Sequence, residues 1–165
     1  MNKLYLMRHA NAPFGNSNRD FERSLDDRGR RQAISVSEHI NRAELKFDKV
    51  MHSTAPRVLE TLSILQDLCK DEFSAEPNPD IYNSDLNHFT NLVRNINPQY
   101  KNVLIIGHNP TIYQFILYFA TNYKETILPE IGMPGANFVE MFFDEEWANI
   151  TPNKYKIGEI FTPMD

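Results

Sequence analysis

The sequence predicts an α/β fold, a three-layer sandwich in which helices cover both faces of a mostly parallel central sheet, with an antiparallel pair of strands at its C-terminal end. Three observations predict it. Short apolar segments alternate with longer segments of helical period. Residues 102–107 contain four consecutive apolar residues, as expected of a strand covered on both faces. Finally, residues 137–143 and 155–161 are strand-like with no helical period between them, which predicts antiparallel pairing.

The elements follow from apolar spacing and from turn residues. Asp26 precedes the first helical segment and is a suitable N-cap, Pro56 suits the first turn of the second helix, and Ser84 can cap the third. The expected order is a strand over 3–7, a loop over 11–24, a helix over 27–44, a strand over 48–52, a helix over 54–70, a loop over 70–80, a helix over 84–96, a strand over 102–107, a helix over 110–123, and strands over 137–143 and 155–161. The length of 165 residues suits one domain, 1–165.

Composition excludes several classes of function. Lys and Arg total 17 against 22 Asp and Glu, a formal net charge of −5, which argues against non-specific binding to nucleic acid or to anionic membranes. No apolar run approaches the roughly 20 residues of a membrane helix, and the apolar stretch before Arg8 is too short for a signal peptide. Cys69 is the one cysteine, expected in the core, so no intrachain disulfide can form. A cytoplasmic protein is expected.

Polar side chains follow three of the predicted strands at the point where each strand ends. Arg8 and His9 follow the first strand, Arg57 lies one turn into the helix after the second, and His108 follows the strand over 102–107. Ligands in α/β sheets bind outside the carboxyl ends of the strands. Arginine forks match phosphate oxygens, and a neutral imidazole can attack phosphorus. The pattern predicts phosphoryl transfer through a phosphohistidine intermediate that requires no metal.

Four segments together resemble a known family. LYLMRHANA (4–12), RSLDDRG (23–29), STAPRVLET (53–61) and LIIGHNP (104–110) are similar, in the same order, to the signature segments of the histidine phosphatase (phosphoglycerate mutase-like) superfamily. The short chain without a mid-chain insertion resembles the SixA-like branch of phosphohistidine phosphatases. The resemblance implies an α/β sandwich, in agreement with the independent prediction. A chain this short offers little cap over the site, so mutase activity is the least expected of the family's reactions.

The resemblance also implies roles for individual residues. His9 becomes the nucleophile, Arg8 and Arg57 become phosphate ligands, and His108 becomes the second catalytic histidine. Asn109 and Arg23, at the edge of the same site, are expected to help bind the phosphate. Two positions depart from the family pattern: Ala10 replaces the usual glycine, and Asp26 stands where threonine is common.

No cofactor and no metal are expected. The HExxH and CxxC motifs and a His-x-His pair are all missing from the sequence. His39 and His88 fall on predicted helices as surface or half-buried groups, and His52 is expected to be structural. The arginines at positions 19, 28, 30 and 31 are expected to form a solvated face.

Larger members of the family use a mid-chain glutamate as general acid, and this chain has no convincing counterpart. Glu76, Asp80 and Asp85 lie in that region, with Asp85 the first candidate. Imidazole leaves with a conjugate-acid pKa near 6.5 and needs little protonation, so a phosphohistidine on a protein, such as a phosphorelay domain, is the expected substrate. Two alternatives remain open: a small-molecule phosphomonoesterase using Asp85 or Asp80, and a non-catalytic module that binds phosphoproteins.

Overall fold

The computed structural model describes residues 1–15 and 19–163 and confirms the α/β class. Six strands form one sheet in the order β3-β2-β4-β1-β5-β6. The strands are β1 (Asn2–Arg8), β2 (Lys49–His52), β3 (Ala75–Pro77), β4 (Asn102–Gly107), β5 (Phe138–Phe143) and β6 (Lys156–Phe161). The helices are α1 (Asp27–Arg42), α2 (Pro56–Leu68), α3 (Leu86–Arg94), α4 (Thr111–Phe119) and α5 (Leu128–Ile131), with short 3-10 turns including η1 (Asp20–Glu22) and η2 (Pro79–Ile81).

The sheet is parallel in its first four strands and antiparallel where the C-terminal pair joins it. β1 pairs with β4, β4 with β2 and β2 with β3, all in parallel, whereas β5 runs antiparallel to β1 and β6 antiparallel to β5. The register places Arg8 opposite Gly107 and His52 opposite Ile106. The three central strands therefore end at the same edge of the sheet, as predicted.

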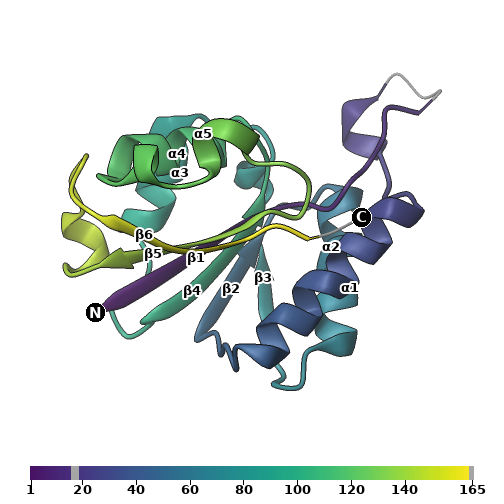
Figure 1. The fold of residues 1–165 in the computed structure, drawn as a ribbon, viewed down its shortest axis with the longest axis horizontal. Coiled ribbons are helices and arrows are strands. Elements are labelled where there is room, and N and C mark those ends of the chain that lie inside the picture. Colours follow the sequence, from purple (N-terminus) through teal and green to yellow (C-terminus); the bar gives the residue numbers. More distant parts are fainter. Residues whose placement is uncertain (16–18, 164–165) are drawn as a thin grey trace.

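The helices cover both faces of the sheet (Figure 1), with α3, α4 and α5 on one side and α1 and α2 on the other. Each face carries its own apolar cluster. Leu4 and Leu6 of β1 belong to the cluster beneath α3 and α4, while Tyr5 and Met7 belong to the cluster beneath α1 and α2. Because successive side chains alternate between faces, burial on both sides explains the uninterrupted apolar run of β1.

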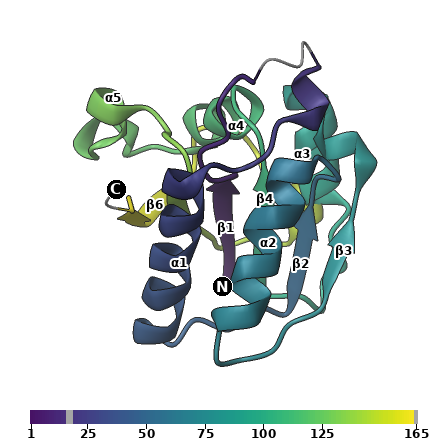
Figure 2. The same cartoon turned by 90° about the vertical axis from the view of Figure 1, so that its right-hand side faces the viewer.

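The helix starts agree in part with the sequence prediction. The Asp26 carboxylate caps α1 by accepting from the Gly29 N–H over 2.8 Å, and Pro56 begins α2, both as expected. The cap of α3 was predicted wrongly: Asp85, not Ser84, accepts from the His88 N–H over 2.8 Å. Figure 2 shows α1 and α2 beginning at the edge toward which β1 points.

Other segments correct the prediction. The expected loop over 70–80 contains β3 and the start of η2, and the helix expected over 110–123 ends at Phe119. The expected loop over 11–24 contains η1, and its residues 16–18 lie outside the described part of the chain. No helix within the described residues has the length and apolar character needed to cross a membrane.

Candidate active site

The carboxyl ends of β1, β2 and β4 open onto a cavity of about 390 Å³. Its walls come from the segments after these strands, from η1, from residues 82–85 between η2 and α3, and from the beginnings of α2 and α4. It is lined by Arg8, His9, Asp20, Arg23, Arg57, Tyr82, Asn83, Ser84, Asp85, His108, Asn109, Pro110, Thr111 and Gln114. The two histidines, the three arginines, Asn109 and Asp85 that the sequence assigned to catalysis or phosphate binding all line this one cavity, whereas the other two candidate acids, Glu76 and Asp80, do not.

His9 follows β1 and is held in one tautomer. Its side chain is 4% exposed, and its Nδ1 lies 2.7 Å from the Ala10 carbonyl oxygen, so Nδ1 carries the proton and donates it. Burial, opposed by the hydrogen bond to that carbonyl and reinforced by His108, Arg8 and Arg57, lowers the pKa of His9 to about 3. The ring is therefore neutral at pH 7, with its lone pair on Nε2.

Arg57 lies in the first turn of α2 and is 4% exposed. Its Nε donates to His9 Nε2 over 3.2 Å, and its Nη2 lies 3.4 Å from His108 Nδ1. A guanidinium has no acceptor atom, so both imidazole nitrogens that face it present lone pairs. Arg57 therefore points two N–H donors at the space between the two histidines.

His108 follows β4 and completes the pair. Its ring centre lies 5.4 Å from that of His9, and its Nε2 is 2.7 Å from Ser53 Oγ, the residue directly after β2. Because Nδ1 accepts from Arg57, Nε2 carries the proton and donates to Ser53. Burial, reinforced by Arg57, lowers the pKa of His108 to about 4.

Arg8 and Asn109 share one acceptor. The Nη1 of Arg8 and the Nδ2 of Asn109 donate to the Met133 carbonyl oxygen over 3.2 and 2.8 Å. The Nε of Arg8 and the Oδ1 of Asn109 are buried and make no hydrogen bond within the described residues. A buried donor without a partner is costly, so this unpaired N–H beside the cavity is a feature that a bound ligand could relieve.

Arg23 and Asp20 close the side of the cavity formed by η1. Arg23 donates from Nε to the Ala12 carbonyl over 3.1 Å and from Nη1 to Asp20 Oδ1 over 2.9 Å. Asp20 Oδ2 accepts from Arg57 Nη2 over 3.0 Å and from the Tyr82 hydroxyl over 2.6 Å. The Tyr82 hydroxyl, Arg23 and Arg57 hold the pKa of Asp20 well below its usual range.

The sequence prediction missed Asp20, Tyr82 and the contact that Ser53 makes. Asp20 is separated from Arg57 by 37 residues and from Tyr82 by 62, so no local spacing pattern relates them. The one signal available was a carboxylate in an arginine-rich segment, RDFER (19–23).

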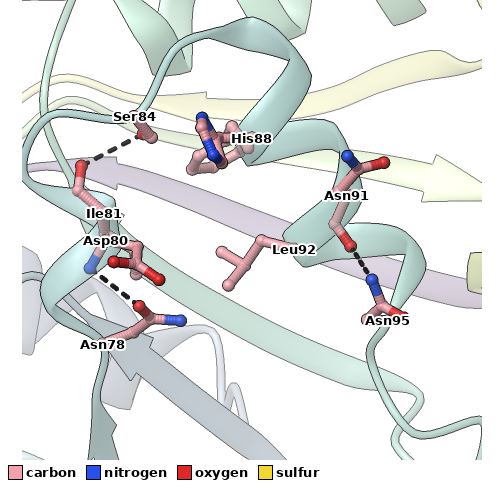
Figure 3. A pocket seen from close by; sticks show the side chains of 9 residues that line it. Asn78, Asp80, Ile81, Ser84, His88, Asn91, Leu92 and Asn95 are labelled. Carbon is pink, nitrogen blue, oxygen red and sulfur yellow. Dashed lines mark hydrogen bonds between the residues drawn. The ribbon is translucent and has the colours of Figure 1, made fainter.

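The three carboxylates considered as general acids have different positions. Asp85 lines the cavity, but its carboxylate accepts from the His88 backbone N–H, which lowers its pKa. Asp80 lies beside Asn78 in a neighbouring pocket that shares Ser84 with the cavity (Figure 3). Glu76 is on β3 and pairs with Lys49.

The remaining histidines and the cysteine lie apart from the cavity. His52 is buried, and its Nδ1 lies 2.9 Å from the Ser53 carbonyl. His88 is exposed on α3, but His39, expected at or near the surface, is buried against Phe161 with ring centres 4.2 Å apart. Cys69 is half-buried, and burial raises its pKa to about 11. Within 1–15 and 19–163, no three His, Cys, Asp or Glu side chains are grouped closely enough to hold a metal ion.

The chain matches one protein family in sequence and several solved structures in fold. Residues 4–92 match the sequence model of the histidine phosphatase superfamily (branch 1). Among solved structures, a protein assigned as phosphohistidine phosphatase SixA from Agrobacterium tumefaciens superposes with a TM-score of 0.81 at 21% identity, covering 98% of each chain. A second such assignment, from Nakamurella multipartitia, gives 0.80 at 22% identity over 99% of this chain and 97% of that one.

A third solved structure is the protein histidine phosphatase SixA complexed with tungstate, with a TM-score of 0.78 at 17% identity over 98% of this chain and 97% of that one. At these identities the likeness shows a shared fold. No curated protein sequence matches the chain.

Proposed function

The chain is a phosphatase that belongs to the histidine phosphatase superfamily, and we propose that it removes phosphoryl groups from phosphohistidine on proteins through a covalent intermediate on His9. The observation that carries this proposal is the state of His9. Its Nδ1–H is held by the Ala10 carbonyl, its Nε2 lone pair accepts from Arg57 at the wall of the cavity, and burial keeps the ring neutral. A neutral imidazole nitrogen that carries its lone pair is a nucleophile for phosphorus once the phosphoryl group takes the place of that hydrogen bond.

The first step transfers the phosphoryl group to the enzyme. The Nε2 lone pair of His9 forms a bond to phosphorus while the bond from phosphorus to the substrate's imidazole nitrogen breaks. The electron pair of that bond stays on the departing nitrogen, which takes a proton from solvent. In the second step water attacks phospho-His9, the bond to Nε2 breaks, inorganic phosphate leaves, and the proton lost by the water passes to solvent.

The donors around His9 suit the charge that develops on the three peripheral oxygens. Arg8 and Arg57 supply guanidinium N–H groups, including the buried Arg8 Nε that lacks a partner among the described residues. His108 presents Nδ1 toward the same space and can take up a proton once a dianion binds beside it. Groups fixed in place before the reaction stabilise the transition state without reorganisation. Arg23 and Asn109 extend the phosphate site at its edge.

The carboxylates of the cavity favour a phosphorus–nitrogen bond over an alkyl ester. Asp20 accepts three hydrogen bonds from side chains, and Asp85 caps α3, so both are held as carboxylates rather than as proton donors. An alkoxide leaving group needs a proton in the transition state, whereas imidazole has a conjugate-acid pKa near 6.5. This difference supports phosphohistidine as the substrate class, and we propose that the protein acts in the cytoplasm.

The deciding experiment incubates the protein with a phosphohistidine peptide and, separately, with an aryl phosphate, both in EDTA. Turnover of the peptide supports the proposal, including the part that needs no metal. The proposal is contradicted if neither substrate is turned over, or if activity seen without EDTA is lost when EDTA is added.

A second candidate is a small-molecule phosphomonoesterase with Asp85 as the acid, because Asp85 lines the cavity. In that case Asp85→Asn should abolish hydrolysis of alkyl phosphates and spare aryl phosphates. Equal rates of alkyl-ester hydrolysis in the variant and the wild type remove this candidate. A module that only binds phosphoproteins is removed if His9 can be trapped with a labelled phosphoryl group.

A further inference from the structure

We propose that Asp20 is a positioning residue that holds the guanidinium of Arg57 in line with the two histidines, an inference that rests on the proposed function. Asp20 begins η1 and meets Arg57 with two atoms. Its backbone carbonyl accepts from Arg57 Nη1 over 2.8 Å, and its Oδ2 accepts from Nη2 over 3.0 Å. A grip on two nitrogens fixes the plane of a guanidinium as well as its position.

The grip leaves the other edge of the guanidinium for chemistry. Asp20 engages the edge formed by Nη1 and Nη2, whereas the edge formed by Nε and Nη2 faces His9 Nε2 and His108 Nδ1. A phosphoryl group attacked by His9 must lie along this second edge, where two parallel N–H groups can hold two of its oxygens. Without the Asp20 carboxylate, the Arg57 side chain could adopt more rotamers. The conformational entropy lost on ordering it would then reduce the free energy gained when the substrate binds and reacts.

Asp20 also fixes a second wall of the site through Tyr82. The Tyr82 hydroxyl donates to Asp20 Oδ2, and the Tyr82 ring meets the His108 ring edge-on at 5.3 Å. The Arg57 guanidinium lies over the Tyr82 ring, 5.6 Å from its centre. The Asp20 carboxylate therefore links Arg57 and Tyr82, the two side chains that pack against His108. Its own hydrogen bonds go to Arg23, Arg57 and Tyr82 rather than to either histidine.

An inhibitory role for Asp20 would have a different effect on the kinetics. If Asp20 instead acted as an internal anion that blocks Arg57, removing its charge would free the arginine for phosphate. The variant would then show a lower KM and an undiminished kcat. Positioning predicts that kcat falls, because the ordered guanidinium is needed in the transition state.

The test compares Asp20→Asn and Asp20→Ala with Asp27→Asn, which removes a charge from a surface pair with Arg30 in the first turn of α1. Aryl phosphate turnover, phosphoenzyme formation in a single turnover and thermal unfolding are measured for each. We expect kcat and the rate of phosphoenzyme formation to fall about 10- to 100-fold in both Asp20 variants, with folded protein retained, and to stay unchanged in the control. Unchanged kcat, or a lower KM alone, overturns the proposal.

A double-mutant cycle separates positioning from a general structural role. If Asp20 acts through Arg57, Asp20→Asn should cost little once Arg57→Ala has been made, whereas independent roles give multiplicative losses. Multiplicative losses overturn the proposal. If the wild type turns over neither substrate, the proposed function has failed. The same cycle is then read on vanadate affinity, where at least about threefold coupling between the two residues supports positioning and no coupling overturns it.

Discussion

The Nε–H of Arg57 donates to Nε2 of His9 over 3.2 Å, so the two residues share one hydrogen bond at the centre of the site. Because guanidinium groups only donate, this bond identifies Nε2 as the nitrogen with the free lone pair. The proton of the ring lies on Nδ1, which points at the Ala10 carbonyl. A phosphoryl group that displaces Arg57 from this contact meets the lone pair directly and gains the same N–H donor for one of its oxygens.

The first prediction concerns the nucleophile. A rapid quench after mixing with a labelled phosphoryl donor should give an acid-labile label on the peptide that contains His9. His9→Ala should lose the label and lower kcat by about 10³-fold or more, since the removed group forms the covalent bond. His52→Ala is the matched control, because His52 is equally buried but lies outside the cavity. A label that persists in His9→Ala moves the nucleophile elsewhere.

The second prediction concerns the charge of the histidine pair. Burial lowers the pKa of His9 to about 3 and that of His108 to about 4, so both rings should stay neutral from pH 7 down to pH 5. Ring NMR signals of the free enzyme, assigned with His9→Asn and His108→Asn, measure this directly. Midpoints near the ordinary value of 6.5 would contradict the burial argument.

The third prediction follows for stability. In the unfolded chain both histidines titrate near 6.5, so between about pH 6 and pH 4.5 the unfolded state binds protons that the folded state does not. Their contribution to the free energy of unfolding is complete above pH 6.5 and falls with pH, by about 1.4 kcal/mol per pH unit for each histidine. The free energy of unfolding, measured with urea at several pH values, should therefore change by about this amount less per pH unit in His108→Asn than in the wild type. The same pH dependence of the free energy of unfolding in His108→Asn and in the wild type would contradict this prediction.

Much of this site could be predicted because backbone periodicity determines it. Four consecutive apolar residues, Leu4–Met7, indicate a strand buried on both faces, and parallel strands end together, so the residues that follow them converge. The edge strand β3 escaped prediction because it is three residues long and pairs on one side only, with a proline and a glutamate among them. Asp85 was missed as a cap because Ser84, one residue earlier, has an equally suitable side chain.

The parts of the site that local sequence could not predict depend on distant contacts. Asp20 reaches Arg57 and Tyr82 because η1 packs against the start of α2, and Ser53 reaches His108 because the neighbouring strands β2 and β4 end side by side. Such pairs leave no periodic signal. Strand ends and the family resemblance therefore predicted residues that line the cavity, and they missed those that hold these residues in place.

The fourth prediction tests one of these supporting contacts. Ser53 is fully buried, receives the Nε2–H of His108 and accepts from the Ala55 N–H over 3.1 Å. Ser53→Ala leaves a buried imidazole donor without a partner, so we expect kcat to fall about tenfold as the ring loses its fixed orientation. Ser37→Ala removes a hydroxyl that is equally buried, in the middle of α1, and should leave kcat unchanged. Equal effects of the two substitutions on kcat would show that only stability is at stake.

The last prediction concerns the first turn of α1, where Gly29 packs against Asn11, two residues after His9. A Cβ added to Gly29 would lie 2.1 Å from the Asn11 carbonyl oxygen, a backbone atom that cannot rotate away. Gly29→Ala must therefore push α1 from the segment after β1, although alanine favours helix by about 1 kcal/mol. We expect a net loss of about 1–2 kcal/mol in the free energy of unfolding, because overpacking outweighs helix propensity.

The same substitution should also reduce activity, since Asn11 directly follows the Ala10 carbonyl that holds the His9 tautomer. Asn11 is further tied to α1 by its N–H, which donates to Gln32 over 2.8 Å, so a shift of the helix moves this carbonyl. Urea unfolding and kcat are measured for Gly29→Ala and for Arg31→Ala, an exposed position on the same helix that should change stability by less than about 0.5 kcal/mol. A Gly29→Ala protein with wild-type stability and kcat would mean that α1 and the segment after β1 separate freely, and that the His9 tautomer does not depend on their contact.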